Sequence, residues 1–260
     1  MQTPYELLLG WRYTRAGRAT RRNGFISFIS GVSMLGIALG VAALIIVLSV
    51  MNGFQKEVRD RMLGVLSHIE VFEANGQAIA NLPQVLSTIE ARPEVLGAAP
   101  FVGAQALIAR GEDMKGALVR GIDPTLEPKV TDLAAELADT VLPRLASGGY
   151  GIVLGGELAR SLGVVVGDTV TLIAPSGQVT PAGVVPRVRS MTVVGTFDSG
   201  HYEYDSALAM LHQDDAARIF RVEGPTGVRV KIRDLHAARE VAVKMAADLP
   251  PGLVVRDWTR

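Results

Sequence analysis

The sequence predicts an α+β protein in which one transmembrane helix near the N-terminus is followed by a mixed domain of strands and helices. No Asp, Glu, Lys or Arg occurs between Arg22 and Lys56, and β-rich stretches alternate irregularly with helical ones over 67–260. Because these stretches lack a strict βαβ rhythm, a doubly wound parallel sheet is disfavoured. The chain has 0 cysteines, which excludes disulfides and thiolate metal sites.

The first segment, 1–24, predicts a short amphipathic stretch along the cytoplasmic membrane surface, because apolar residues are interspersed with arginines and Glu6 is its only acid. An excess of arginine beside a membrane helix holds that end in the cytoplasm. The N-terminus is therefore predicted to lie in the cytoplasm and the rest of the chain outside the inner membrane. The arginines are Arg12, Arg15, Arg18, Arg21 and Arg22.

The apolar run 25–51 predicts the transmembrane helix. It exceeds the ~20 helical residues that cross a bilayer of about 30 Å, and it has no polar stripe of the kind that a soluble helix carries. A cleaved signal peptide is disfavoured, because its apolar region is shorter and ends in a small-x-small site. Gly36 and Gly40 form a GxxxG pair, which favours close packing against another membrane helix.

The charged segment 52–66 predicts a stalk helix, and 67–260 predicts the periplasmic domain, with a division near Gly148-Gly149. Periodicity and turn residues predict its elements. The predicted strands are 68–72, 102–109, 115–121, 169–173, 190–196, 207–211, 227–232 and 252–257, of which the second and third form a hairpin. The predicted helices are 83–90, 131–138, 155–162 and 235–249.

Segment 174–189 predicts a proline-stiffened loop, because proline is excluded from central strands and most hairpins close within a few residues. Two interpretations stay open: a mobile surface loop, or a protruding recognition loop whose arginines pair with acids of a partner. The candidate binding residues are Pro175, Pro181, Pro186, Arg187 and Arg189.

Other chemistry finds little support in the sequence. It has no Walker-type phosphate loop, and its four histidines lack metal-ligand spacing. The net charge of +0 excludes a basic nucleic-acid signature over the whole chain. Ser199, His201 and Asp205 are catalytic residue types, but neighbours along the chain rarely converge as a triad, so they are interpreted as a polar loop. We therefore expect no catalytic residue, no metal and no bound cofactor.

Several stretches resemble the lipoprotein-releasing permeases LolC and LolE, and the resemblance covers essentially the whole chain. The exit from the apolar run is the most specific of them, whereas the Gly-Asp and Gly-Ile-Asp-Pro elements are shared more widely with MacB-like periplasmic domains. The stretches are Arg12-Tyr13, the Ser-Phe-Ile-Ser … Gly-Ile-Ala-Leu-Gly-Val-Ala-Ala-Leu run, Leu48-Ser-Val-Met-Asn-Gly-Phe54, Gly121-Ile-Asp-Pro124, Ile152–Val164, Gly167-Asp168 and Val194-Gly-Thr-Phe197.

The resemblance implies a non-catalytic permease subunit of an ABC transporter that extracts lipoproteins from the inner membrane and hands them to the periplasmic chaperone LolA for outer-membrane localisation. ATP and Mg²⁺ would be bound by the partner ATPase LolD, and a second permease subunit would be LolE-like or a second copy. It further implies that 174–189 is a hook that engages LolA, and that Val47, Val50 and Met51 border the cavity for the acyl chains.

Within that resemblance, a LolC-like subunit and a hybrid LolC/E (LolF) subunit both remain open. Members of the family carry further membrane helices after the periplasmic domain, so the chain, which stops at Arg260, is expected to be an N-terminal fragment. Two other functions stay as alternatives: a MacB-like efflux permease subunit that assembles with an adaptor protein, and an FtsX-like regulator of a cell-wall hydrolase.

Overall fold

The computed structural model describes Tyr5, Leu9 and residues 24–65, 67–180 and 183–259. It divides the chain into two compact units, Met1–Arg59 and Asp60–Arg260, each of which is described by itself. The predicted amphipathic segment 1–24 lies outside the described residues, apart from Tyr5, Leu9 and Gly24.

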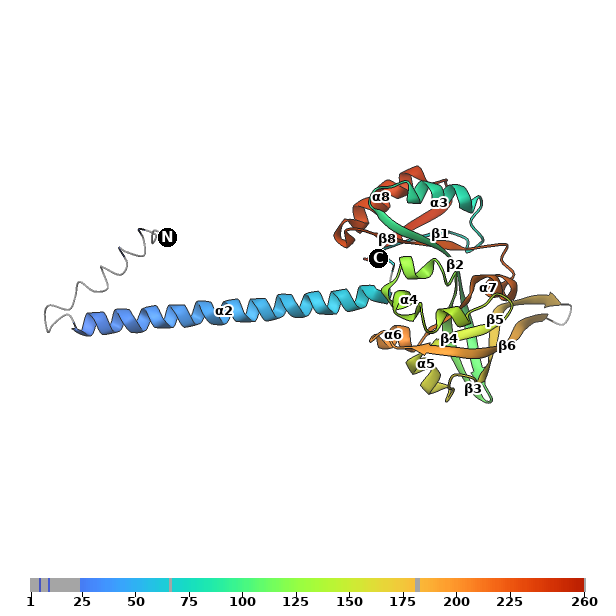
Figure 1. Cartoon of the computed structure of the whole chain (residues 1–260), viewed down its shortest axis with the longest axis horizontal. Helices are drawn as coiled ribbons and strands as arrows, with labels where there is room; N and C mark the ends of the chain where they lie inside the picture. Colours follow the sequence, from blue (N-terminus) through green and yellow to red (C-terminus); the bar gives the residue numbers. More distant parts are fainter. Residues whose placement is uncertain (1–4, 6–8, 10–23, 66, 181–182, 260) are drawn as a thin grey trace. The chain divides into compact units, whose positions relative to one another are not determined.

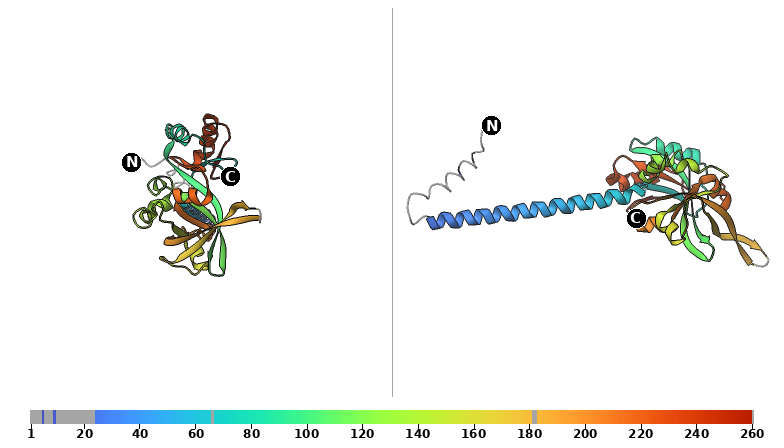
Figure 2. Two further views of the ribbon diagram at one scale, coloured as in Figure 1. Left: turned by 90° about the vertical axis from the view of Figure 1, so that its right-hand side faces the viewer. Right: turned by 60° about the horizontal axis from the view of Figure 1, so that its bottom comes forward.

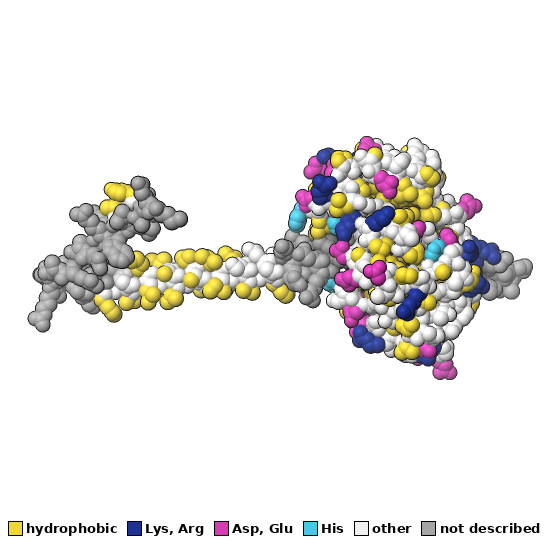
Figure 3. All heavy atoms as spheres, in the orientation of Figure 1, with side chains coloured by type: hydrophobic (Ala, Val, Ile, Leu, Met, Phe, Trp, Pro, Cys, Tyr) yellow, Lys and Arg dark blue, Asp and Glu magenta, His cyan; other side chains and the backbone are white. Residues whose placement is uncertain are grey.

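One continuous helix, α2 (Gly24–Val65), covers both the predicted transmembrane helix and the predicted stalk. Its part Phe28–Gln55 has a mean hydropathy of 2.7, which is long and apolar enough to cross a membrane. None of that part is buried against the rest of the described chain, and Figure 3 shows hydrophobic side chains along it. A helix with this much exposed apolar surface is suited to lipid or to the surface of other membrane helices.

Within its described residues, the second unit is built on nine strands and short helices, which confirms the predicted α+β class (Figure 1). The strands are β1 (Ile69–Glu73), β2 (Val95–Arg110), β3 (Asp113–Ile122), β4 (Gly151–Gly155), β5 (Thr169–Thr180), β6 (Gly183–Phe197), β7 (Leu208–His212), β8 (Gly227–Ile232) and β9 (Leu253–Asp257). The helices are α3 (Leu82–Glu90), α4 (Asp132–Leu137), α5 (Gly156–Ser161), α6 (Tyr202–Asp205), α7 (Gln213–Phe220) and α8 (Ala238–Asp248), with 3₁₀ turns η1 (Glu127–Lys129), η2 (Leu142–Arg144) and η3 (Leu235–Ala237).

Strand β2 belongs to two lobes of this unit. Its first half, β8, β1 and β9 form an antiparallel sheet in the order β2-β8-β1-β9, and α3 and α8 cover one face of it (Figures 1 and 2). This is the split βαβ arrangement, here called the βαβ lobe. The order β2-β3-β7-β4-β6-β5 returns to β2, because β3 pairs with β2 and with β7, and these strands form a closed ring, here called the barrel lobe.

The chain passes from the βαβ lobe to the barrel lobe and back, so the division predicted near Gly148-Gly149 is wrong. These glycines lie in a turn of the barrel lobe, before β4. The chain leaves the βαβ lobe and enters the barrel lobe inside β2, at Phe101, which pairs with Gly227 of β8 and with Ile122 of β3. Gly227 allows this junction, since a Cβ there would lie 2.5 Å from the ring of Phe101.

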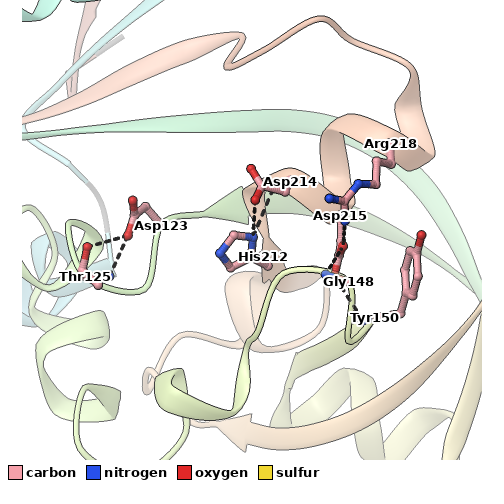
Figure 4. Close-up of polar contacts among 8 residues, drawn as sticks. All are labelled: Asp123, Thr125, Gly148, Tyr150, His212, Asp214, Asp215 and Arg218. Atoms are coloured by element: carbon pink, nitrogen blue, oxygen red, sulfur yellow. Dashed lines mark hydrogen bonds and ion pairs between the residues drawn. The ribbon is translucent and has the colours of Figure 1, made fainter.

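The predicted elements outside 174–189 are confirmed, most with small shifts of their ends, and the β2–β3 hairpin is among them. Strand β2 begins at Val95 and not at 102, and β4, α6 and α7 were not predicted. The two elements that resemble MacB-like periplasmic domains, Gly121-Ile-Asp-Pro124 and Gly167-Asp168, form a close contact and tight turns. Gly121 lies against α7, where a Cβ would come within 2.4 Å of the Ala216 Cβ, and the next turn is closed by Asp123, which accepts hydrogen bonds from Thr125 (Figure 4). Gly167 has φ +100°, and Asp168 accepts a hydrogen bond from the Val165 N–H.

The predicted loop 174–189 is wrong, because β5 and β6 run through it as a two-stranded arm (Figure 2). Ala174 pairs with Arg187 and Gln178 with Val185, with a register shift between these pairs. The physical reason is that β5 is paired with β2 only at 171–173, so the arm beyond it has free edges. Proline is tolerated on such edges and at bulges. Pro181 lies outside the described residues.

Candidate functional site

The candidate site is a cluster of arginines where the arm leaves the barrel lobe. Arg187 and Arg189 of β6, Arg218 of α7 and Arg221 surround Tyr150, and with Val188 and Ile219 they line a cavity of about 310 Å³. The four arginines and Tyr150 are together called the arm-root cluster. It joins two residues of the predicted recognition segment to three that lie elsewhere in the sequence.

Asp215 stabilises one side of the arm-root cluster, between Arg218 and Gly148 (Figure 4). Its side chain is 0% exposed and accepts hydrogen bonds from the Gly148 N–H at 2.8 Å and the Tyr150 N–H at 3.1 Å. The same carboxylate pairs with Arg218 at 2.9 Å. A buried carboxylate with three donors stabilises the turn before β4 and so holds Tyr150 in place.

The sequence places Asp215 there through the start of α7. The side chain of His212, the residue before the helix, accepts a hydrogen bond from the Asp214 N–H, and Asp214 and Asp215 occupy the first turn. Acids are favoured at this end of a helix by the partial positive charge of its free N–H groups. Asp214 is half exposed, whereas Asp215 points into the lobe.

On the other side of the arm-root cluster, the guanidinium of Arg189 lies 3.7 Å above the centre of the Tyr150 ring. Arg187 donates a hydrogen bond to the Ile219 carbonyl at 3.5 Å and is only partly exposed. Arg189, Arg218 and Arg221 are exposed. Of the described residues that line the cavity, four are cationic and none is acidic, so the surface attracts anionic groups.

Of the predicted site residues, the structure brings Arg187 and Arg189 together with Tyr150, while Pro175 and Pro186 are exposed on the arm. Tyr150, Arg218 and Arg221 were missed by the sequence analysis. Nothing in their local sequence relates them to 174–189. Tyr150 reaches the arm through the pairing of β4 with β6, which is a long-range contact. The one available signal was the acidic first turn of α7.

The predicted membrane residues lie in the apolar part of α2. Val47, Val50 and Met51 are 60%, 66% and 52% exposed. A Cβ added at Gly36 or Gly40 would meet nothing within 4 Å, so the backbone is accessible to another helix there.

The stretch with catalytic residue types forms a local turn. The carboxylate of Asp205, which is buried, accepts hydrogen bonds from the N–H and the hydroxyl of Ser199 at 2.8 and 2.7 Å. The Ser199 hydroxyl in turn accepts from the His201 N–H. Within 24–65, 67–180 and 183–259, no group of three or more His, Cys, Asp and Glu side chains is placed to hold a metal ion.

Comparison with known proteins gives a consistent result. The family model of the MacB-like periplasmic core domain matches residues 30–248. "Lipoprotein-releasing system transmembrane protein LolC" of Xylella fastidiosa is 44% identical over 260 residues, which is 100% of this chain and 62% of that protein. LolC of Neisseria meningitidis is 43% identical over 98% of this chain and 61% of its own length. LolE of Haemophilus influenzae is 30% identical over 99% and 62%.

The chain therefore spans about 62% of the length of the first of these relatives. The match covers α2 and both lobes, and so it includes the apolar helix and the arm.

Proposed function

Because this chain belongs to the family of MacB-like periplasmic core domains and is related over its whole length to LolC and LolE, we propose that it is a membrane subunit of a lipoprotein-releasing ABC transporter. It extracts lipoproteins from the inner membrane and hands them to the periplasmic chaperone LolA, which takes them on towards the outer membrane. In this role α2 crosses the inner membrane, with the N-terminus in the cytoplasm and the two lobes in the periplasm. The excess of arginine before the apolar run supports this orientation.

The observation that carries the proposal is the arm together with its root. Two paired strands are stiffer than a loop, so an arm of this kind loses less conformational entropy when it binds a partner. The exposed Arg189, held over Tyr150, supplies a cation beside the arm. The arm 174–189 then acts as the hook, and an acidic surface of LolA meets its root.

The chain itself performs no catalysis in this proposal. ATP and Mg²⁺ are bound by a separate ATPase subunit, LolD, and a second permease subunit, LolE-like or a second copy, completes the membrane part. Gly36 and Gly40 offer a surface on which a helix of that subunit packs. The exposed side chains of Val47, Val50 and Met51 border the path of the acyl chains.

The proposal is tested by capture of purified LolA on the chain in detergent. Arg189→Glu, and separately deletion of 177–186, abolish capture, whereas the matched charge reversal Arg160→Glu leaves it unchanged. Arg160 is the control because its side chain is 65% exposed and pairs with Glu157 on α5, outside the arm and the arm-root cluster. Circular dichroism and thermal melting confirm that each variant is folded.

Undiminished capture by both folded variants would overturn the assignment of the hook. If the chain captured an adaptor protein instead of LolA, a MacB-like efflux permease would be the better conclusion. If it captured a cell-wall hydrolase, an FtsX-like regulator would be.

A further inference from the structure

A groove with charged residues at its base lies between the two lobes, away from the arm. Two adjoining cavities of about 310 and 230 Å³ share Glu70, Leu118, Arg120 and Arg256 in their lining. Glu70 lies on β1 and Arg256 on β9 of the βαβ lobe, whereas Leu118 and Arg120 lie on β3 of the barrel lobe. The two cavities together are called the inter-lobe groove.

The strand register builds the base of the groove. Glu70 of β1 lies directly across from Arg229 of β8 and from Arg256 of β9. Its carboxylate is 2.6 Å from the Arg256 guanidinium, 3.5 Å from that of Arg120 and 3.9 Å from that of Arg229. Arg229 also pairs with Glu127, which is fully buried. One carboxylate is thus shared by three arginines.

Of these three arginines, Arg120 has the weakest ion pairing. The residue is 8% exposed, and its closest described acid is Glu70, at the 3.5 Å of a loose pair. Burial, and next the nearby Arg229, lower the pKa of Arg120 to about 10, because Glu70 and Glu127 offset these effects only in part. A buried cation in this state gains from a further anion that reaches it through the groove.

The walls of the groove carry apolar and aromatic side chains beside charged ones, among them Glu73 in the smaller cavity. Leu118 points to the same side of β3 as Arg120, two residues away, and is 40% exposed. Tyr204 and Trp258 line the larger cavity and Phe72 the smaller one, where Arg256 lies 5.2 Å from the centre of the Phe72 ring. Asp257 also lines the larger cavity, and its carboxylate accepts a hydrogen bond from the Thr259 N–H at 2.9 Å. Apolar walls with a few fixed charges suit an extended peptide.

We propose that the inter-lobe groove binds an extended segment of polypeptide through a carboxylate side chain that reaches Arg120. Resting on the proposed function, this segment is the stretch of the lipoprotein cargo next to its lipid anchor. The position of the groove supports that choice. Ser67, which lines it, follows the end of α2 by two residues, and Trp258, which also lines it, follows Asp257, the strand partner of Ile69.

Peptide binding is measured directly on the purified chain in detergent. The probe is a fluorescein-labelled decapeptide with three glutamates, and the matched probe has glutamines instead. The glutamate peptide binds at least about tenfold more tightly, and Arg120→Gln removes this difference. Leu118→Glu, on the exposed rim, weakens binding of the acidic peptide by a similar factor through like-charge repulsion, without disturbing the buried network.

Arg189→Glu separates this proposal from the proposed function. It leaves binding of the acidic peptide unchanged, and Arg120→Gln and Leu118→Glu leave capture of LolA unchanged. Equal affinity for the two peptides, or undiminished binding to both Leu118→Glu and Arg120→Gln, would overturn the groove proposal, whatever the result with LolA.

Cross-linking in cells identifies the occupant. A photo-reactive benzoylphenylalanine at position 118 of the full chain, in its membrane complex, forms an adduct with an epitope-tagged lipoprotein. Benzoylphenylalanine at position 114, an exposed site on the same strand, forms no such adduct. Replacing the acids of the cargo segment with amides lowers the yield at least about fivefold. An adduct with phospholipid alone, or no adduct, would overturn the assignment of the cargo.

Discussion

The arm-root cluster and the inter-lobe groove both gather arginines around aromatic rings, yet they differ in what surrounds the charges. In the arm-root cluster the side chain of Arg218 is 53% exposed and Arg189 lies on an exposed strand. Beneath the groove the side chains of Arg229 and Glu127 are 3% and 1% exposed. Water screens the first set, so its charges add little to stability, and the exposed Arg189 and Arg221 can meet a partner.

The buried set has the opposite property. Its charges interact in a medium of lower dielectric, so each arginine depends on its acid, and removing one partner leaves a costly buried charge. The same residue types therefore serve recognition in one place and the joining of two lobes in the other. Burial decides between these roles, and four experiments test how far that holds.

The largest effect is expected from Glu127→Ala. This change removes the closest acid of the buried Arg229, and we expect a loss of about 3–5 kcal/mol in the free energy of unfolding. Chemical denaturation of the chain in detergent measures it. Asp132→Ala is the control, because Asp132 is 63% exposed and its pair with Lys231 is worth at most about 1 kcal/mol. Equal effects of the two variants would contradict the role of burial.

The next effect is expected from Asp215→Ala, which tests the buried acid that supports the exposed cluster. The N–H groups of Gly148 and Tyr150 lose their acceptor, and we expect a loss of about 2–3 kcal/mol. The free Tyr150 no longer supports Arg189, so capture of LolA also weakens. Asp214→Ala, at a half-exposed acid in the same turn, costs less than about 1 kcal/mol. A fully stable Asp215→Ala variant would show that the turn does not depend on this carboxylate.

A smaller effect is expected from acid pH. Burial alone would raise the pKa of Glu70, but Arg120, Arg229 and Arg256 together outweigh it and hold that pKa below the ordinary value of 4.5. Since the folded-state pKa is lowered, the contribution of Glu70 is fully present above pH 4.5 and is lost as the pH falls through the lowered value.

Thermal melting between pH 7 and pH 3 measures this dependence. Glu70→Gln flattens that part of the curve, whereas Glu112→Gln, at an exposed acid in the turn between β2 and β3, leaves its shape unchanged. Superimposable curves for the wild type and Glu70→Gln would refute the coupling.

The smallest effect on stability is expected from Arg189→Ala. The contact between its guanidinium and the Tyr150 ring is exposed, so its loss costs about 0.5–1 kcal/mol. A double-mutant cycle with Tyr150→Leu isolates that contact. A loss above about 2 kcal/mol would mean that the arm-root cluster stabilises the fold, as the buried charges beneath the inter-lobe groove do.

Local pattern predicted much of the fold correctly. The β2–β3 hairpin follows from two β-rich stretches separated by Gly-Glu-Asp, and α8 from apolar residues at helical spacing. The pattern failed at 174–189, because three prolines are evidence against a central strand but not against a two-stranded arm with free edges. The distinction depends on how far β2 runs beside β5, which no local pattern contains.

The sequence by itself determined the apolar helix, the order of most strands and the arginines of the arm, since these depend on composition and on periodicity within a few residues. Only the tertiary structure decided which charges are buried. Glu70, Arg120 and Arg229 are far apart along the chain, and each lies in a strand with ordinary alternation. They meet because β1 lies between β8 and β9 while β2 joins the two lobes, and that long-range register converts surface residue types into a buried network.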